Sequence, residues 1–268
     1  MKLKIRLCSK LFFISWLFIG GLIFTSTLFP AFDLLCKLPS AKQKRDWFKK
    51  LWFRCFRAIV GLKITQDGIP SSQSGLLVSN HISWLDIVAL NQFFPGYFVA
   101  KSDILSWPVV GFLAKQGGTI FIRRGDKQHV KETTELMIWQ LKQKSMVVVF
   151  PEGTTTRGDD VLSFHASLFQ PALLTRSNVQ VVALQYLGEA KDYAPFIGDA
   201  GFVPHLIKML SLKEIEVRVA FLATINTSGK SRHAISNEAR TLISDTLTGE
   251  SQSKISEVHP ILKQANRI

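Results

Sequence analysis

The sequence has little of what disulfide-stapled domains, metal centres and serine hydrolases require. Its 268 residues include three cysteines, and none has the spacing of a metal-ligand set or of a disulfide framework. The six histidines form no metal-ligand cluster, and no Gly-x-Ser-x-Gly motif occurs. The sequence therefore predicts no metal site and no resident cofactor, and it argues against serine-hydrolase chemistry.

Acidic residues are also scarce. The position of the excess basic residues along the chain indicates whether they bind nucleic acid or anionic lipids. Lys and Arg number 33 against 20 Asp and Glu, a formal net charge of +13. The first 57 residues hold twelve Lys or Arg and two Asp, so the rest of the chain is nearly balanced. Basic residues that flank an apolar segment fit contact with anionic membrane lipids, and we expect no nucleic-acid partner.

The same region contains a run of 22 residues, 11–32, without a charged side chain. As a helix this run would cover about 30 Å, the thickness of a bilayer core. A removable signal peptide is the competing interpretation, but the run is long for one and ends without a small-x-small cleavage site. We expect a retained membrane segment, and Gly20, Gly21 and Pro30 leave open a bent or re-entrant path instead of a straight span.

A second helix is predicted after this run. Apolar side chains recur there at helical spacing with basic residues opposite them: Phe48, Leu51, Trp52, Cys55, Phe56 and Ile59 against Lys50, Arg54 and Arg57. The pattern is typical of a helix that lies in the membrane interface, and an ordinary helix packed on a core is the alternative. Eight basic residues follow the apolar run by residue 57 and four precede it. This predicts location in the inner, or cytoplasmic, membrane with the main domain facing the cytoplasm.

From about residue 70, strand-like and helix-like segments alternate, which indicates an α/β domain. Strands are expected at 76–78, 97–100, 119–122, 146–150, 179–185 and 215–222, and helices at 127–144 and 231–247. The expected fold is a mixed, largely parallel sheet flanked by helices, with an N-terminal membrane-associated helical segment. We divide the chain into a membrane anchor with an interfacial helix (1–62), an α/β domain (63–250) and a polar C-terminal tail (251–268).

The most informative residues are His81 and Asp86, which follow the first of these strands. A carboxylate beside an imidazole can fix its tautomer and stabilise the imidazolium that forms when the ring takes a proton. A strand that leads straight into the pair suits a sheet that presents catalytic groups at its end. The spacing His-x4-Asp alone occurs often by chance, so its meaning depends on other segments.

Two further segments lie where a predicted strand gives way to a loop. One apolar strand ends in Arg123 and Arg124, whose guanidinium groups suit a phosphate or carboxylate, although a solvated strand end is the plainer interpretation. Another ends in Phe-Pro-Glu-Gly-Thr at 150–154, a tight turn whose backbone amides and hydroxyl can face ligand oxygens.

Together and in this order, the three segments resemble the glycerolipid acyltransferase family, typified by lysophosphatidic acid acyltransferases. The family pattern is Asn-His-x4-Asp, Gly-x-x-Phe-Ile-x-Arg and Phe-Pro-Glu-Gly-Thr. Residues 80–86, 118–124 and 150–154 match it in full, and we name them the first, second and third motifs. The resemblance covers roughly residues 70–190. It implies a membrane-bound O-acyltransferase of phospholipid biosynthesis, which moves a fatty acyl group from acyl-CoA or acyl carrier protein to a lysolipid hydroxyl.

The resemblance also implies a role for each matched residue. His81 would be the base for the lipid hydroxyl, and Asp86 its orienter. Arg124 would hold the acceptor's phosphate, and Lys101, after the second predicted strand, is a weaker candidate for the same contact. The other residues implied in substrate binding are Gly118, Phe121, Glu152, Gly153 and Thr154.

Two departures from the family pattern touch the acceptor side. The run 179–184 lacks the proline usual in the family's fourth segment. Thr155 and Thr156 precede Arg157, where many relatives have arginine or serine directly after the third motif. The expected acceptor is 1-acyl-sn-glycerol-3-phosphate, giving phosphatidic acid, and another lysolipid such as lyso-ornithine lipid is the alternative. A non-catalytic lipid-binding protein and a thioesterase are the remaining hypotheses.

Overall fold

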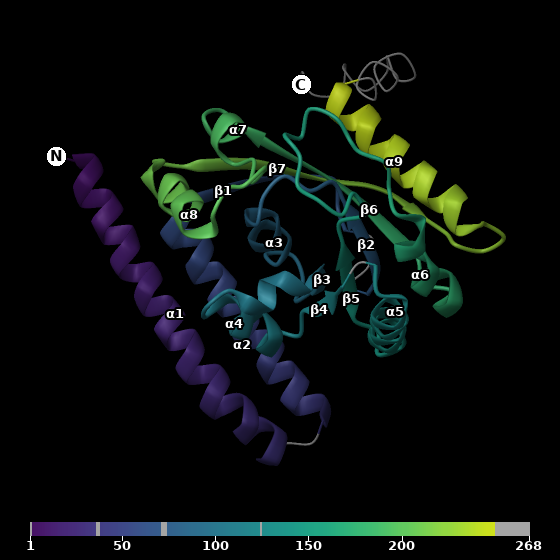
Figure 1. Cartoon of the computed structure of the whole chain (residues 1–268), viewed down its shortest axis with the longest axis horizontal. Helices are drawn as coiled ribbons and strands as arrows, with labels where there is room; N and C mark the ends of the chain where they lie inside the picture. The colour runs from purple at the N-terminus through teal and green to yellow at the C-terminus, as the bar shows by residue number, and fades with distance from the viewer. Residues whose placement is uncertain (1, 36–37, 71–73, 124, 250–268) are drawn as a thin grey trace, which may run out of the picture.

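The computed structural model describes residues 2–35, 38–70, 74–123 and 125–249 (Figure 1). Its helices are α1 (Lys2–Leu35), α2 (Leu38–Val60), α3 (Leu85–Leu90), α4 (Val110–Gln116), α5 (Lys127–Lys142), α6 (Gln170–Thr175), α7 (Ala190–Tyr193), α8 (Phe202–Ser211) and α9 (Arg232–Thr248), with 3-10 turns η1 (Ser102–Ser106) and η2 (Ala166–Phe169). Its strands are β1 (Leu62–Asp67), β2 (Gly75–Ser79), β3 (Tyr97–Lys101), β4 (Ile120–Ile122), β5 (Met146–Val149), β6 (Val179–Leu187) and β7 (Ile215–Ile225).

The strands of the described chain form one seven-stranded sheet in the order β1-β7-β6-β2-β5-β3-β4. The strands from β6 to β4 in this order run parallel to one another, whereas β7 is antiparallel to β6 and parallel to β1. The predicted mixed, largely parallel sheet is confirmed. Because parallel strands end at the same edge of a sheet, the segments that follow β2, β3, β4 and β5 gather at one edge.

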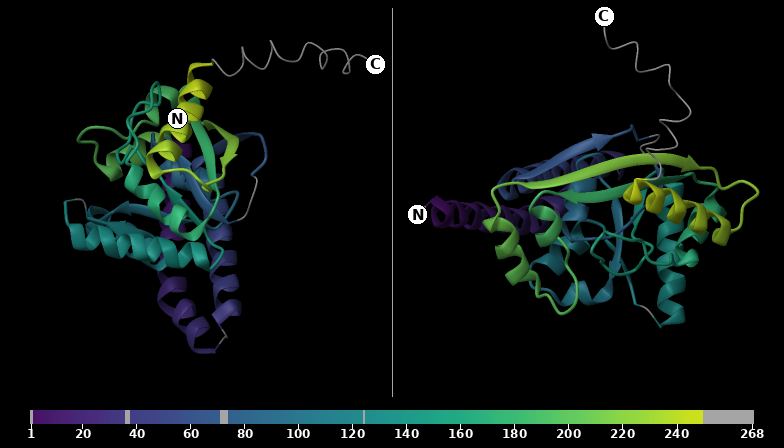
Figure 2. Two further views of the ribbon diagram at one scale, coloured as in Figure 1. Left: turned by 90° about the vertical axis from the view of Figure 1, so that its right-hand side faces the viewer. Right: turned by 90° about the horizontal axis from the view of Figure 1, so that it is seen from above.

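Each face of the sheet is covered by its own group of helices. Side chains alternate along a strand, so Leu77 and Val148 enter the core under α2, α3, α7 and α8. Leu76 and Val147 enter the opposite core, under α5, α6 and α9. The two groups lie on either side of the sheet in Figures 1 and 2. The strand β2 is buried along its whole length, which explains its continuous apolar sequence.

All six strands and both helices predicted for the α/β domain occur, with bounds shifted by a few residues at most. The elements that were not expected are β1 and the short helices α3, α4, α6, α7 and α8. The helices α3, α4, α6 and α7 have four to seven residues each, too few to show a clear period in sequence, so they could not be separated from loops. Helix α8 has ten residues with apolar side chains at helical spacing, and this signal was missed.

The two N-terminal helices form a hairpin whose connected ends project beyond the sheet (Figures 1 and 2). Phe18 meets Trp52 with ring centroids 5.5 Å apart, and Phe24 stacks on Phe48 at 4.7 Å. Only part of the apolar side of α2 is therefore free to face the membrane. Phe48 and Trp52 pack on α1, whereas Leu51 and Cys55 are exposed.

The start of α1 is fastened to the α/β domain. Lys10 Nζ donates to the carbonyl oxygens of Val60 and Leu212, both at 2.8 Å. Arg6 Nη2 donates to the carbonyl oxygen of Ser211, at the end of α8, at 2.7 Å. The anchor and the α/β domain therefore pack together in the structure.

Helix α1 is continuous through the glycine pair and Pro30. Its 34 residues extend about 51 Å at 1.5 Å per residue. Residues Leu3–Phe32 are long and apolar enough to cross a membrane, and little of this stretch is buried within the chain. The predicted polar tail, 251–268, lies outside the described residues.

Candidate active site

His81 and Asp86 form a hydrogen-bonded pair at the carboxyl edge of β2. His81 Nδ1 lies 2.8 Å from Asp86 Oδ2. The carboxylate is wholly buried, whereas 19% of the histidine side chain is exposed. A carboxylate beside Nδ1 fixes that nitrogen as the protonated one, so Nε2 carries the free lone pair and can accept a proton.

The Asp86 carboxylate is held in one orientation by further donors. Oδ2 also accepts from the backbone N–H groups of Ile82, at 2.7 Å, and Ser83, at 2.9 Å. Oδ1 accepts from the hydroxyl of Tyr186 on β6, at 2.7 Å. These hydrogen bonds replace the water that a buried carboxylate loses, so the carboxylate is tolerated inside the fold.

The loop that carries His81 is bound to the strands on both sides of β2. The Asn80 side chain is buried; it donates to the carbonyl oxygen of Leu184 on β6 at 2.9 Å and accepts from the N–H of Leu184 at 2.8 Å. On the β5 side, Thr156 N donates to the carbonyl oxygen of His81 at 2.8 Å. The ring of Phe150 stacks on the imidazole with centroids 3.9 Å apart. These contacts fix the position of the His81 ring before any substrate binds.

Glu152 is a second carboxylate beside His81, and both of its oxygens bind backbone. Oε1 accepts from His81 N at 2.8 Å and Oε2 from Leu162 N at 3.0 Å. Burial raises the pKa of Glu152, while the two backbone hydrogen bonds act in the opposite direction. In this structure Glu152 joins the His81 loop to the segment that follows the third motif.

We expect Glu152→Ala to lower the free energy of unfolding by about 2 kcal/mol, because it leaves the N–H groups of His81 and Leu162 without an acceptor. Urea unfolding of the detergent-solubilised protein measures the change. The matched control is Glu135→Ala on the exposed side of α5, which should change stability by less than about 0.5 kcal/mol. Equal small effects for the two substitutions would show that Glu152 does not brace the loop.

The third motif forms the predicted tight turn, with Pro151 and Glu152 at its centre. Gly153 has a φ of +70°, in the left-handed region that favours glycine, and its N–H donates to the carbonyl oxygen of Phe150 at 2.9 Å. Thr154 is exposed, so a ligand can reach its hydroxyl.

The residues of the second motif lie around β4, at the far edge of the sheet. Phe121 is half-buried in β4, and Lys101 is exposed at the end of β3, in register with the last residue of β4. Gly118 precedes β4, where a Cβ would come within 2.8 Å of the Tyr97 ring. Arg124 lies outside the described residues. Within the described chain no hydrogen bond joins these residues to His81, and their predicted roles stay predictions.

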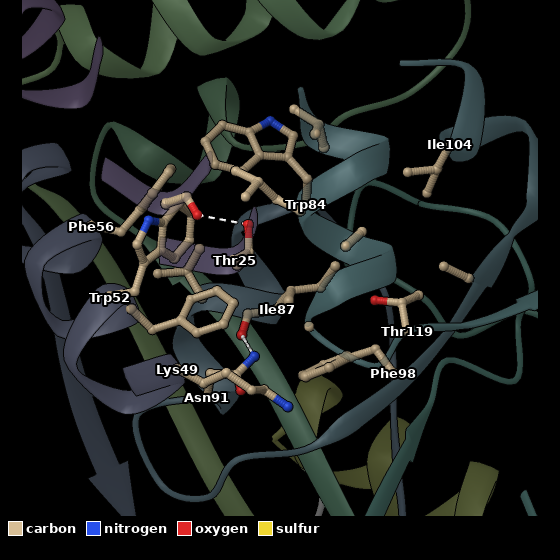
Figure 3. Close-up of a pocket in the computed structure, with 18 of the residues that line it drawn as sticks. Thr25, Lys49, Trp52, Phe56, Trp84, Ile87, Asn91, Phe98, Ile104 and Thr119 are labelled. Atoms are coloured by element: carbon tan, nitrogen blue, oxygen red, sulfur yellow. Dashed lines mark hydrogen bonds between the residues drawn. The ribbon is translucent and has the colours of Figure 1, made fainter. Parts of the chain in front are cut away.

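An apolar cavity of about 200 Å³ lies between the N-terminal hairpin and α3 (Figure 3). Phe98 lines it and connects it to the pair, since its ring lies 6.3 Å from that of Phe150, which stacks on His81. The other lining residues come from the hairpin, from α3, from β3 and the segment between β3 and β4, and from the start of α8. They include Phe18, Gly21, Thr25, Phe29, Phe48, Lys49, Trp52, Phe53, Phe56, Trp84, Ile87, Val88, Asn91, Ala100, Gly117, Thr119 and Phe202.

Sequence reasoning missed two residues that contact the pair, Tyr186 and Phe150 through its ring. Tyr186 is 100 positions away from Asp86 along the chain, so no local spacing could connect them. The available signal was a tyrosine at the end of an apolar strand, because a buried phenol hydroxyl usually has a hydrogen-bond partner.

Comparison with known proteins places this geometry in a family. The acyltransferase family model matches residues 62–186, which include all three motifs. Two proteins named lyso-ornithine lipid O-acyltransferase are each 32% identical to the chain. The one from Pseudomonas aeruginosa aligns over 76% of this chain and 80% of its own length, and the one from Rhizobium meliloti over 87% and 86%. A 1-acyl-sn-glycerol-3-phosphate acyltransferase from Neisseria meningitidis is 33% identical, over 67% of this chain and 71% of its own.

A solved structure shows the same fold. The crystal structure of the LPA acyltransferase PlsC from Thermotoga maritima superposes with a TM-score of 0.63 and 18% sequence identity, over 92% of this chain and 98% of that one. Sequence matches of this length and identity, together with a shared fold, leave the family in no doubt. The chain belongs to the glycerolipid acyltransferase family, and it is an O-acyltransferase of lipid biosynthesis.

Proposed function

We propose that this enzyme transfers a fatty acyl group from the thioester of acyl-CoA or acyl carrier protein to the free hydroxyl of a lysolipid. The observation that carries the proposal is the 2.8 Å contact between His81 Nδ1 and the buried Asp86, which leaves Nε2 free for the lipid's proton. A lipid hydroxyl is a poor nucleophile, so a base within hydrogen-bond reach must take its proton as it attacks.

The reaction balances with the two substrates alone. The lipid hydroxyl oxygen forms a bond to the thioester carbonyl carbon while its proton passes to His81 Nε2. The tetrahedral intermediate then collapses, the C–S bond breaks, and the sulfur takes the proton from His81 and leaves as a thiol. Asp86 stabilises the imidazolium between the two steps, and the histidine ends neutral.

The apolar cavity supports a substrate with a long hydrocarbon chain. It follows one face of α3 from Trp84, three positions after His81, to Asn91 at the end of the helix (Figure 3). A chain laid along this face would reach from the catalytic pair toward the hairpin. Each CH2 group moved from water into such a site gains about 0.8 kcal/mol.

The hairpin supports association with one leaflet of the membrane rather than a full crossing. Helix α2 runs back along α1 and carries Lys44, Lys50 and Arg54. A crossing by α1 would draw these charges toward the hydrocarbon core, which costs about 3 kcal/mol for each one at the centre. An interfacial position leaves them among the headgroups and lets the lipid substrate and product stay in the membrane. We also propose that the catalytic domain faces the cytoplasm.

For the acceptor we propose 1-acyl-sn-glycerol-3-phosphate, with phosphatidic acid as the product. The second motif, which resembles the phosphate-binding segment of lysophosphatidic acid acyltransferases, supports this choice. Lyso-ornithine lipid is the second candidate, because the relatives of that name align over up to 87% of the chain. The threonines at 155 and 156 also stand where many family members have arginine or serine.

A panel of lysolipids distinguishes these acceptors. The purified protein in mixed micelles receives labelled palmitoyl-CoA, or in a parallel arm palmitoyl-acyl carrier protein. Each arm is given 1-acyl-sn-glycerol-3-phosphate, lyso-ornithine lipid or lysophosphatidylcholine at equal surface concentration. We expect labelled phosphatidic acid as the main product. Labelled ornithine lipid alone would assign the second acceptor, and a folded protein that acylates no lysolipid would contradict the proposed function.

A further inference from the structure

Tyr186 occupies the one oxygen of Asp86 that His81 does not contact. The residue is 3% exposed, and its hydroxyl donates to Asp86 Oδ1 at 2.7 Å. Burial raises the pKa of Tyr186 well above its usual value, and the charge of Asp86 raises it further. The phenol therefore stays protonated and remains a hydrogen-bond donor throughout the range in which a histidine titrates.

We propose that Tyr186 is a positioning residue that sets the strength of the Asp86–His81 interaction, and through it the pH at which His81 becomes a neutral base. The inference rests on the proposed function of His81 and Asp86. The carboxylate shares its charge among four donors, so each donor reduces the charge that is left to stabilise the imidazolium. Loss of the phenol donor would leave the imidazolium more stable.

The origin of the donors shows why Tyr186 differs from the other three. The donors from His81, Ile82 and Ser83 lie in the loop directly before α3, which carries Asp86 in its first turn, so they move with the carboxylate. Tyr186 belongs to β6, which is paired in register with β2. Its hydroxyl therefore fixes the carboxylate relative to the sheet.

A second contact from β6 reaches the same motif. Leu184, two positions before Tyr186 and on the same side of the strand, exchanges two hydrogen bonds with the Asn80 side chain. The strand β6 thus holds the first motif at both ends, through Asn80 before the histidine and through Asp86 after it. A displacement of β6 would move the base and its orienter together.

Glu152 is the other titratable side chain of the described residues that is bonded to the His81 segment. It accepts from the backbone N–H of His81 and not from the ring, and its second oxygen is held by Leu162. Neither contact involves Tyr186. A change in the titration of His81 after substitution of the tyrosine alone would therefore not come through Glu152.

Two substitutions with opposite expected effects test the proposal. Tyr186→Phe keeps the ring and removes the donor; we expect kcat/KM to fall about tenfold and the acidic limb of its pH profile to move up by about half a pH unit. Incorporation of 3-fluorotyrosine at position 186 keeps the hydroxyl and makes it a stronger donor, so the limb should move to lower pH. Tyr97→Phe makes the same change on β3, away from the pair, and should leave the limb in place.

The shifts separate a tuning role from a structural one. If both position-186 variants keep the wild-type limb, the proposal is wrong, even if Tyr186→Phe is unstable, because the fluorotyrosine variant retains the ring and the hydroxyl. NMR titration of the His81 ring with labelled histidine should show the same opposite shifts without any substrate. If the wild-type enzyme acylates no lysolipid, the proposed function is wrong. The role of Tyr186 is still decided in that case, because the NMR titration of His81 needs no substrate.

Discussion

Replacement of His81 by alanine should lower kcat/KM for lysolipid acylation about 10³-fold, within the range that a general base contributes. The ring takes the hydroxyl proton in the proposed mechanism, and neither neighbouring carboxylate is free to replace it. Asp86 is buried under four donors, and Glu152 binds two backbone N–H groups. The rate of labelled diacyl lipid formation in mixed micelles measures the loss.

A second histidine substitution, away from the catalytic pair, is the control for His81→Ala. His233 is exposed on α9, in the helix layer on the other face of the sheet, and His233→Ala should retain the wild-type rate. Urea unfolding of both variants checks that the fold is intact. An His81→Ala enzyme that keeps more than a tenth of the wild-type kcat/KM would show that another group removes the proton.

Substitution of Asp86 by asparagine should lower kcat/KM about 10²-fold while the loop keeps its shape. The asparagine carbonyl oxygen can take the place of Oδ2 and accept from His81, Ile82 and Ser83, and the Tyr186 hydroxyl can turn to accept from the new amide group. What disappears is the negative charge that stabilises the imidazolium. The acidic limb of the pH profile should therefore move to lower pH, opposite to the shift expected for Tyr186→Phe.

The two substitutions should not add. Once the imidazole is gone, Asp86 has no imidazolium to stabilise, so the double variant His81→Ala/Asp86→Asn should be about as active as His81→Ala alone. Values of kcat/KM for the lysolipid give the comparison. A double variant a further 10²-fold slower would mean that Asp86 acts on the reaction independently of His81.

The catalytic pair could be predicted from sequence because its parts are local. His81 and Asp86 are five positions apart, so one loop and the first turn of α3 bring them together. The preceding apolar run is buried on both faces and follows the pattern of a central parallel strand. The Phe-Pro-Glu-Gly-Thr turn then lies at the same edge, since β5 is parallel to β2.

What escaped prediction depends on which segments become neighbours. Tyr186 and Leu184 contact the first motif because their strand, β6, pairs with β2, which lies about a hundred residues earlier in the chain. The reversed direction of β7 leaves no mark on its sequence, because an apolar strand looks alike in either direction. The apolar face of α2 was visible in the sequence, but its pattern does not say that α1 covers part of it, as the Phe24–Phe48 stack shows.

Free thiol and acylated lipid should appear one for one, and only when lysolipid is present. A thiol reagent counts the CoA released from acyl-CoA, and mass spectrometry counts the diacyl product in the same samples of wild type and His81→Ala. We expect equal amounts of both products from the wild type, none without lysolipid, and about 10³-fold slower formation of both with the variant. Thiol release without lysolipid, or lipid acylation by His81→Ala at the wild-type rate, would contradict a transfer for which His81 is the base.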